Sequence, residues 1–145
     1  MKHHVVLHLI SKLLIPYILV FALYVQFHGD YGPGGGFQAG VIFGAAFILY
    51  SIVFGKHLVA KVVPATAVYT TAALGVLLYT AVGVAGMLFG GFFLDYSVLS
   101  SDPVAGQHKG ILLIELGVGI TVASVMISLF FCYSNYAHPK DSDTT

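Results

Sequence analysis

The sequence predicts an all-α integral membrane protein with four transmembrane helices. Of its 145 residues, 58% are hydrophobic and 8% are charged, and the mean hydropathy is +0.92. Soluble domains carry about 25% charged residues. The apolar residues gather in four runs, each near the roughly 20 residues that cross a bilayer as a helix. We therefore expect residues 1–145 to form one membrane domain.

The first two expected helices cover residues 9–27 and 37–54. The first run is longer than the core of a secretory signal, which is roughly 7 to 15 residues, and no small-residue cleavage motif follows it. It contains Pro16, which predicts a kink. Lys12 lies about one turn inside the run, where its long side chain can reach the lipid headgroups. We expect this segment to remain as a membrane helix.

The other two expected helices cover residues 65–88 and 110–133, joined by a longer connector over residues 90–109. Orientation follows from lysine bias, because cytoplasmic loops are enriched in positive charge. Among the lysines outside the spans, four fall on one side, namely Lys2, Lys56, Lys61 and Lys140, and Lys109 falls on the other. This bias predicts both termini in the cytoplasm of a multi-pass protein of the cell (inner or plasma) membrane.

Several function classes are excluded by composition. The six basic residues are all lysines and are balanced by six acids, so no basic face is available for nucleic acid. A single cysteine, Cys132, excludes an internal disulfide and a cysteine-ligated cluster. The histidines lie at ends and in loops, where they cannot pair as haem ligands in mid-membrane. We expect no metal, no cofactor and no enzymatic activity.

A glycine-rich turn over residues 28–40 organises the chain. Pro33 cannot donate an amide hydrogen, and the glycines from Gly34 to Gly36 permit backbone angles closed to other residues, so a helix cannot run through this segment. Its loose match to a dinucleotide-binding fingerprint is rejected, because that fingerprint must follow a strand. The backbone must turn here, on the outer side of the membrane.

Small residues recur every fourth position after this turn. Gly36, Gly40 and Gly44 fall on one face of the second helix, where they allow close approach of another backbone. Similar pairs follow in the third and fourth helices. These faces suggest a subunit of a larger assembly; packing within the chain is the alternative.

Glu115 is the strongest single candidate for function. It lies five residues after Gly110, or about 7.5 Å into the fourth span. A carboxyl group inside the membrane is costly, and it is a candidate proton carrier, ion ligand or partner of a cation. The alternative is a structural polar contact near the interface. Four residues are expected on the same side and could form with Glu115 either an ion-handling cluster or a wet rim: His28, Asp30, His108 and Lys109.

The turn residues carry a family resemblance. The pattern His28-Gly29-x-x-x-Pro33-Gly34-Gly35-Gly36-Phe37-Gln38-x-Gly40 resembles the signature of the MnhB (MrpB) domain of the Mrp multisubunit sodium/proton antiporter. The resemblance covers nearly the whole chain. It implies an assembly of about seven membrane subunits in the lipid bilayer, which exchanges cytoplasmic Na⁺ for external H⁺. This chain lacks the deep lysine of the antiporter-like subunits, so the resemblance implies an accessory subunit.

Two departures from the family pattern bear on the site. The family often has histidine at the position of Asp30 and glycine at that of Ala39, and it tends to have aspartate where this chain has Glu115. The resemblance implies a subunit that shapes an interface or part of an ion path. We expect the turn from His28 to Gly40 to build the subunit contact, and Glu115, His28 and Asp30 are the candidates for handling protons or cations. Two alternatives remain open: a subunit of a membrane-bound hydrogenase-type complex, and a scaffold without transport.

Overall fold

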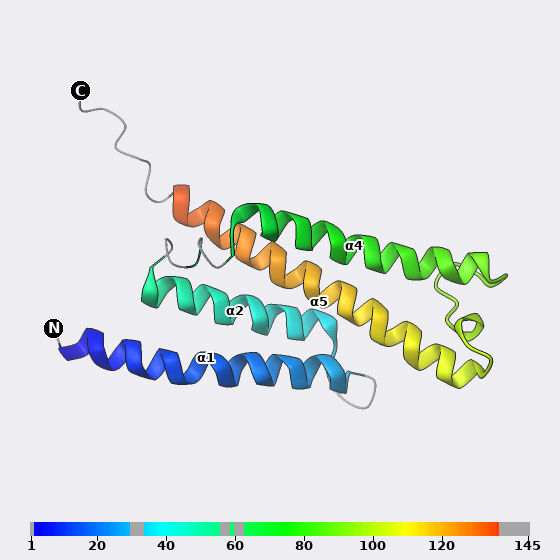
Figure 1. The fold of residues 1–145 in the computed structure, drawn as a ribbon, viewed down its shortest axis with the longest axis horizontal. Helices are drawn as coiled ribbons and strands as arrows, with labels where there is room; N and C mark the ends of the chain where they lie inside the picture. Colours follow the sequence, from blue (N-terminus) through cyan, green and yellow to red (C-terminus); the bar gives the residue numbers. More distant parts are fainter. Residues whose placement is uncertain (1, 30–33, 56–58, 60–62, 137–145) are drawn as a thin grey trace, which may run out of the picture.

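The computed structural model describes residues 2–29, 34–55, 59 and 63–136, with side chains over residues 5–29, 34–55, 59 and 63–134. Its regular elements, labelled as in Figure 1, are all helical within these ranges: α1 (Lys2–His28), α2 (Gly36–Phe54), α4 (Ala65–Leu88), the short 3₁₀ helix η1 (Ser97–Leu99) and α5 (Pro103–Tyr136). Four of these helices are long and apolar enough to cross a membrane. The predicted fold class is confirmed.

The helices α1, α2 and α5 are longer than the predicted spans, most clearly α5, whereas α4 has the predicted bounds. This helix begins at Pro103, seven residues before the expected start at Gly110. The Asp102 carboxyl accepts the Val104 N–H at 3.2 Å, which is helix capping, and proline is favoured at the first helical position. The helix therefore starts at its capping residues, whereas the apolar run that predicted the span marks only the part of the helix expected within the bilayer. At the other end of the chain, α1 continues through Pro16 as one helix.

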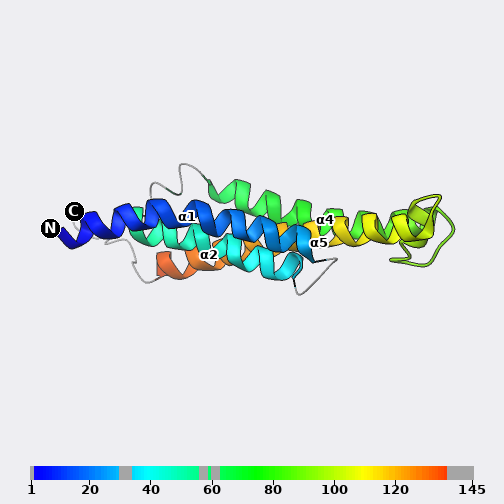
Figure 2. The ribbon, with the colours of Figure 1, turned by 90° about the horizontal axis from the view of Figure 1, so that it is seen from below.

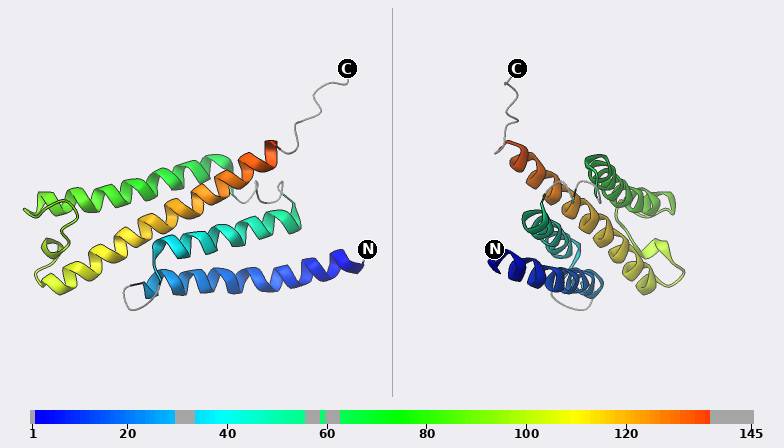
Figure 3. Two further views of the ribbon diagram at one scale, coloured as in Figure 1. Left: turned by 180° about the vertical axis from the view of Figure 1, so that it is seen from behind. Right: turned by 60° about the vertical axis from the view of Figure 1, so that its left-hand side comes forward.

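The four long helices form a single staggered layer. In Figure 1 they lie in the order α4, α5, α2, α1, and Figure 2 shows the layer from its edge. The central helix α5 packs against both α4 and α2, and α1 packs against α2. The two further views in Figure 3 show the same order, with the start of α1 and the end of α5 at the same end of the layer.

Glycines bring the backbones of the layer together. A Cβ built on Gly40 would lie 2.6 Å from the carbonyl oxygen of Gly119, and one on Gly117 would lie 2.9 Å from that of Gly75. Real Cβ atoms are not found so close to other atoms, so glycine is required at both crossings. The close-packed face predicted for the second helix is therefore present, and α5 of the same chain occupies it.

The end of α1 and the start of α2 do not lie at the end of the layer. A Cβ on Gly36 would overlap the backbone of Glu115, which lies twelve residues after Pro103, or about 18 Å along α5. Two residues later, Gly117 packs on Gly75, the eleventh of the 24 residues of α4. The start of α2 is thus level with the middle of α4, and α4 and α5 extend well past it (Figure 1).

The connector over residues 89–102 folds back on the end of α4 and the start of α5. The ring of Phe93 lies where a Cβ on Gly83 would be, and the ring of Tyr96 lies where one on Gly110 would be. The Asp95 carboxylate accepts hydrogen bonds from Ser97, at 2.5 Å from the hydroxyl and 3.1 Å from the N–H. These bonds lower the pKa of Asp95, and burial raises the pKa of Tyr96.

Candidate functional site

Glu115 meets the glycine turn at the point where α1 ends and α2 begins. Its side chain is half-buried. A Cβ on Gly29 would lie 2.6 Å from Glu115 Oε2, and a Cβ on Gly35 would lie 3.1 Å from Oε1. The carboxyl group therefore fills the space that the missing glycine side chains leave. Three segments that are distant in sequence meet at this carboxyl: the end of α1, the start of α2 and the middle of α5.

The start of α2 gives this junction its electrostatic character. Gly36 is the first residue of α2, and the preceding Gly35 makes no side-chain cap and has φ +137°, which favours glycine. The first N–H groups of a helix have no partner within it and carry the positive end of the helix dipole. A carboxyl group at this position is therefore placed where a negative charge is favoured.

Gln26 is a second polar side chain at this junction, and the sequence analysis missed it. It lies on α1 and is 5% exposed, with Oε1 against Gly119, one turn along α5 from Glu115. Its Nε2 atom is buried without a hydrogen-bond partner among the described residues. One signal was available in the sequence, because Gln26 is an amide within the apolar run from Ala22 to Phe27. Buried polar groups of this kind require an explanation.

The expected outer cluster is only partly assembled. His28 is the last residue of α1, and its ring stacks on Tyr24 with centroids 5.0 Å apart. Asp30 and Pro33 lie outside the described residues. His108 and Lys109 are exposed and lie about 10.5 and 9 Å before Glu115 along α5. Because α5 starts earlier than expected, these two residues belong to the helix and are not level with Glu115.

The remaining turn residues divide between two faces of α2. Gly34 is half-buried, whereas Gly35, Gly36, Gly40 and Gly44 are buried. Phe37 is 63% exposed, and Gln38 is also exposed. Since α5 already covers the glycine face, Phe37 and Gln38 are the members of this set whose side chains stay exposed.

Comparison with known proteins identifies the family. A family model described as "Domain related to MnhB subunit of Na+/H+ antiporter" matches residues 6–128. Proteins named "Putative antiporter subunit mnhB2" from Staphylococcus aureus strains Newman and JH1 are each 34% identical over 136 residues, covering 92% of this chain and 96% of the relative. The chain belongs to the MnhB family. It is thereby an accessory membrane subunit of a multisubunit Na⁺/H⁺ antiporter, and other subunits are its partners.

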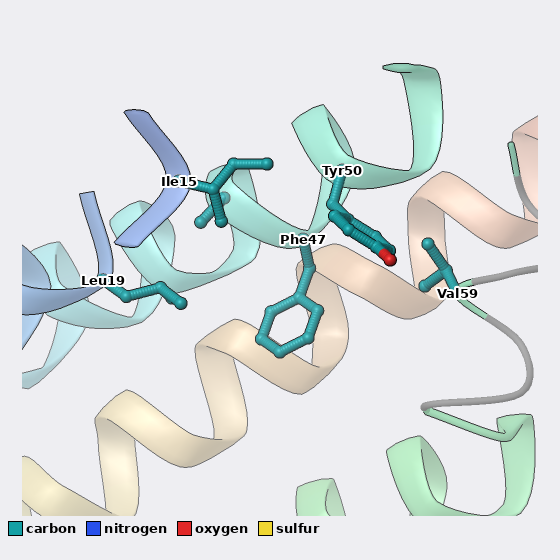
Figure 4. A pocket seen from close by; sticks show the side chains of 6 residues that line it. Ile15, Leu19, Phe47, Tyr50 and Val59 are labelled. Atoms are coloured by element: carbon teal, nitrogen blue, oxygen red, sulfur yellow. The ribbon is translucent and has the colours of Figure 1, made fainter. Parts of the chain in front are cut away.

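This MnhB-family subunit has one apolar hollow away from the junction and a second one beside Gln26. The smaller, of about 150 Å³, lies between α1 and α2 and is lined by Ile15, Leu19, Ala46, Phe47, Tyr50 and Val59 (Figure 4). Val59 is 1% exposed and closes one side. This hollow carries no titratable group other than Tyr50, and we interpret it as a packing gap. The larger is a groove of about 400 Å³ beside Gln26.

The described residues of this MnhB-family subunit do not form a metal centre. Nowhere in residues 5–29, 34–55, 59 and 63–134 do three His, Cys, Asp or Glu side chains gather closely enough to hold a metal ion. Cys132 is exposed on α5. The chemistry that the junction offers is that of one carboxyl group, Glu115, beside helix N–H groups and a buried amide.

Proposed function

We propose that this subunit supplies the carboxyl group of Glu115 to the ion path of a Na⁺/H⁺ antiporter of about seven subunits. The observation that carries the proposal is the position of this carboxyl, against Gly29 and Gly35 at the start of α2. An acid within a membrane helix is costly and is a functional candidate by default. Here the protein also arranges the end of another helix around it.

The depth of the glycine turn supports this role. Irregular backbone at membrane depth is tolerated where it is buried in protein or lines a cavity. Membrane transporters commonly place helix ends near the bilayer midplane, where their backbone groups bind ions and charged substrates. The break between α1 and α2 is level with the middle of α4 and faces Glu115. In this arrangement the helix N–H groups can stabilise the charged form of a carboxyl group that gains and loses a proton or a cation.

Two further candidates belong to the same path. His28 ends α1 directly before Gly29, which touches the Glu115 carboxyl. Asp30 follows Gly29 in the chain. We propose that these residues deliver protons or Na⁺ to Glu115 from the outer side, with both termini in the cytoplasm and the subunit in the cell membrane. Phe37 and Gln38, which are exposed on α2, are proposed to contact a neighbouring subunit.

The test is exchange activity of the complete complex carrying Glu115→Gln. This change keeps the size of the side chain and removes its ionisation. We expect Na⁺-dependent proton exchange in everted membrane vesicles to fall by about tenfold or more, in the range of a lost proton-transfer group. A native gel should show the complex intact, and Glu115→Asp should retain part of the exchange. Normal exchange with Glu115→Gln would reduce the subunit to a scaffold.

A further inference from the structure

A groove runs along one face of the helix layer. Its volume is about 400 Å³. Its floor is α5, from Leu116 to Ile127, which includes the small residues Gly119 and Ala123; Phe43 and Phe47 of α2 and Gln26 of α1 line it as well. Thr71, from the first part of α4, lines the groove from the opposite edge, where it contacts Ser124 of α5. The floor from Gly119 to Ile127 is about 12 Å long, or about two helical turns.

The polar groups of the groove differ in their hydrogen bonding. The hydroxyls of Thr71 and Ser124 are 2.9 Å apart and bond to each other. Gln26 is the exception, since its Nε2 atom lacks a partner among the described residues. The terminal torsion of a glutamine is soft, so a small rotation of the amide can present the nitrogen to the groove. The lining is otherwise almost entirely apolar, and this amide is its unmet donor.

These properties select among the possible occupants. Water does not fill an apolar groove, because it needs two to four polar partners. A lipid chain matches the apolar lining but has no acceptor for Gln26, and an unmet polar group in hydrocarbon is costly. A transmembrane helix satisfies both demands, and Gly119 and Ala123 allow its backbone to approach closely. We propose that a transmembrane helix of another antiporter subunit lies in this groove and accepts a hydrogen bond from Gln26.

This proposal rests on the membership of the chain in a multisubunit antiporter and is independent of the ion-path role of Glu115. If Glu115→Gln loses exchange but no helix is found in the groove, only the groove proposal fails. If a helix is found in the groove but Glu115→Gln exchanges normally, only the ion-path proposal fails. Each can therefore fail alone.

The first experiment is photo-cross-linking in the purified complete complex. We would place p-benzoylphenylalanine at Ile120, which lines the groove, or at Val125, which is exposed and five residues away, about 140° around α5. We expect the Ile120 probe to form an adduct with one transmembrane peptide of another subunit, identified by mass spectrometry. An adduct with lipid alone, no protein adduct, or the same peptide from both positions would overturn the proposal.

The second experiment tests the amide. Gln26→Leu keeps the approximate volume and removes the donor, and we expect the Ile120 adduct to fall by about threefold, as for an average interhelical hydrogen bond. Gln107→Leu, at an exposed glutamine of α5, is the matched control and should leave the adduct unchanged. An equal adduct in both variants would exclude the hydrogen bond.

A third experiment tests whether water fills the groove. Ile120→Cys would be made in a Cys132→Ser background, because Cys132 is itself exposed. We expect the new thiol to be protected from a membrane-impermeant thiol reagent in the intact complex. Rapid labelling would show a water-filled groove and overturn the proposal.

Discussion

The carboxyl group of Glu115 lies directly against Gly29, where a Cβ would be 2.6 Å from Oε2 and 2.7 Å from Oε1. These oxygens are the far end of a flexible side chain. A methyl group at Gly29 can therefore move the carboxyl without separating the helices. A substitution at Gly29 can therefore displace the carboxyl group of Glu115 without changing Glu115 itself.

Gly29→Ala tests this displacement. We expect the complex to assemble normally and Na⁺-dependent proton exchange to fall toward the level of Glu115→Gln, because the carboxyl leaves its position beside α2. The measurement is exchange in everted vesicles together with a native gel. Because the two changes act on the same group, the double variant Gly29→Ala, Glu115→Gln should show no further loss. Wild-type exchange in Gly29→Ala would contradict the assigned position of the carboxyl.

Gly36→Ala should act differently, because its new methyl group would overlap the backbone of Glu115 and not a flexible side chain. The helices α2 and α5 must then separate, at a cost of about 1–3 kcal/mol for overpacking. We expect a lower thermal midpoint of the complex in detergent and a weaker native-gel band. Ala45→Val, on the exposed face of α2, adds more atoms and should change neither. Equal effects of the two changes would contradict the packing.

The fold could be predicted because the bilayer imposes it. The four apolar runs predicted α1, α2, α4 and α5, and the spacing of Gly36, Gly40 and Gly44 predicted a close-packed face. The start of α5 was also readable, since Asp102 and Pro103 are a helix start signal, but the polar residues that follow Pro103 are equally typical of a loop. What the spacing could not give was the identity of the neighbouring backbone.

The sequence predicted the separate parts of the site but not the contact between them. Glu115 stands out because its neighbours are apolar, and the turn stands out because helices cannot contain it. Their contact depends on the stagger of α2 against α5, which is set by which glycine meets which carbonyl. Sequence alone carries no measure of that register. Gln26 was missed because a single amide in a membrane helix becomes informative only once its burial is known.

The hydrogen bond between Thr71 and Ser124 should contribute little to stability. Their hydroxyl oxygens are 2.9 Å apart, and double-mutant cycles in membrane proteins average about 0.6 kcal/mol for such pairs. We expect a coupling of that size between Thr71→Val and Ser124→Ala, measured by unfolding of the complex in detergent. Thr70→Val is the control, because Thr70 is exposed and bonds to Thr66 of its own helix. A coupling above about 2 kcal/mol would show that the pair anchors α4 to α5.

The connector over residues 89–102 should loosen in acid through Asp95. Hydrogen bonds from the Ser97 hydroxyl, and then from its N–H, lower the pKa of Asp95 below its ordinary value of 3.8. A lowered carboxyl pKa contributes stability that is complete above the unfolded pKa and is lost as the pH falls through the folded one. The attachment of the connector should therefore be constant above pH 3.8 and weaken progressively below it.

Pepsin cleavage near Phe92 and Phe93, which are exposed, measures this attachment because pepsin works in acid. Above pH 3.8, Asp95→Asn should be cut faster than the native subunit, and Ser97→Ala should behave similarly because it removes the strongest bond to the carboxylate. As the pH falls further, the native carboxylate is protonated and the cleavage rates should converge. A constant ratio between native and Asp95→Asn at every pH would show that the charge of Asp95 does not hold the connector.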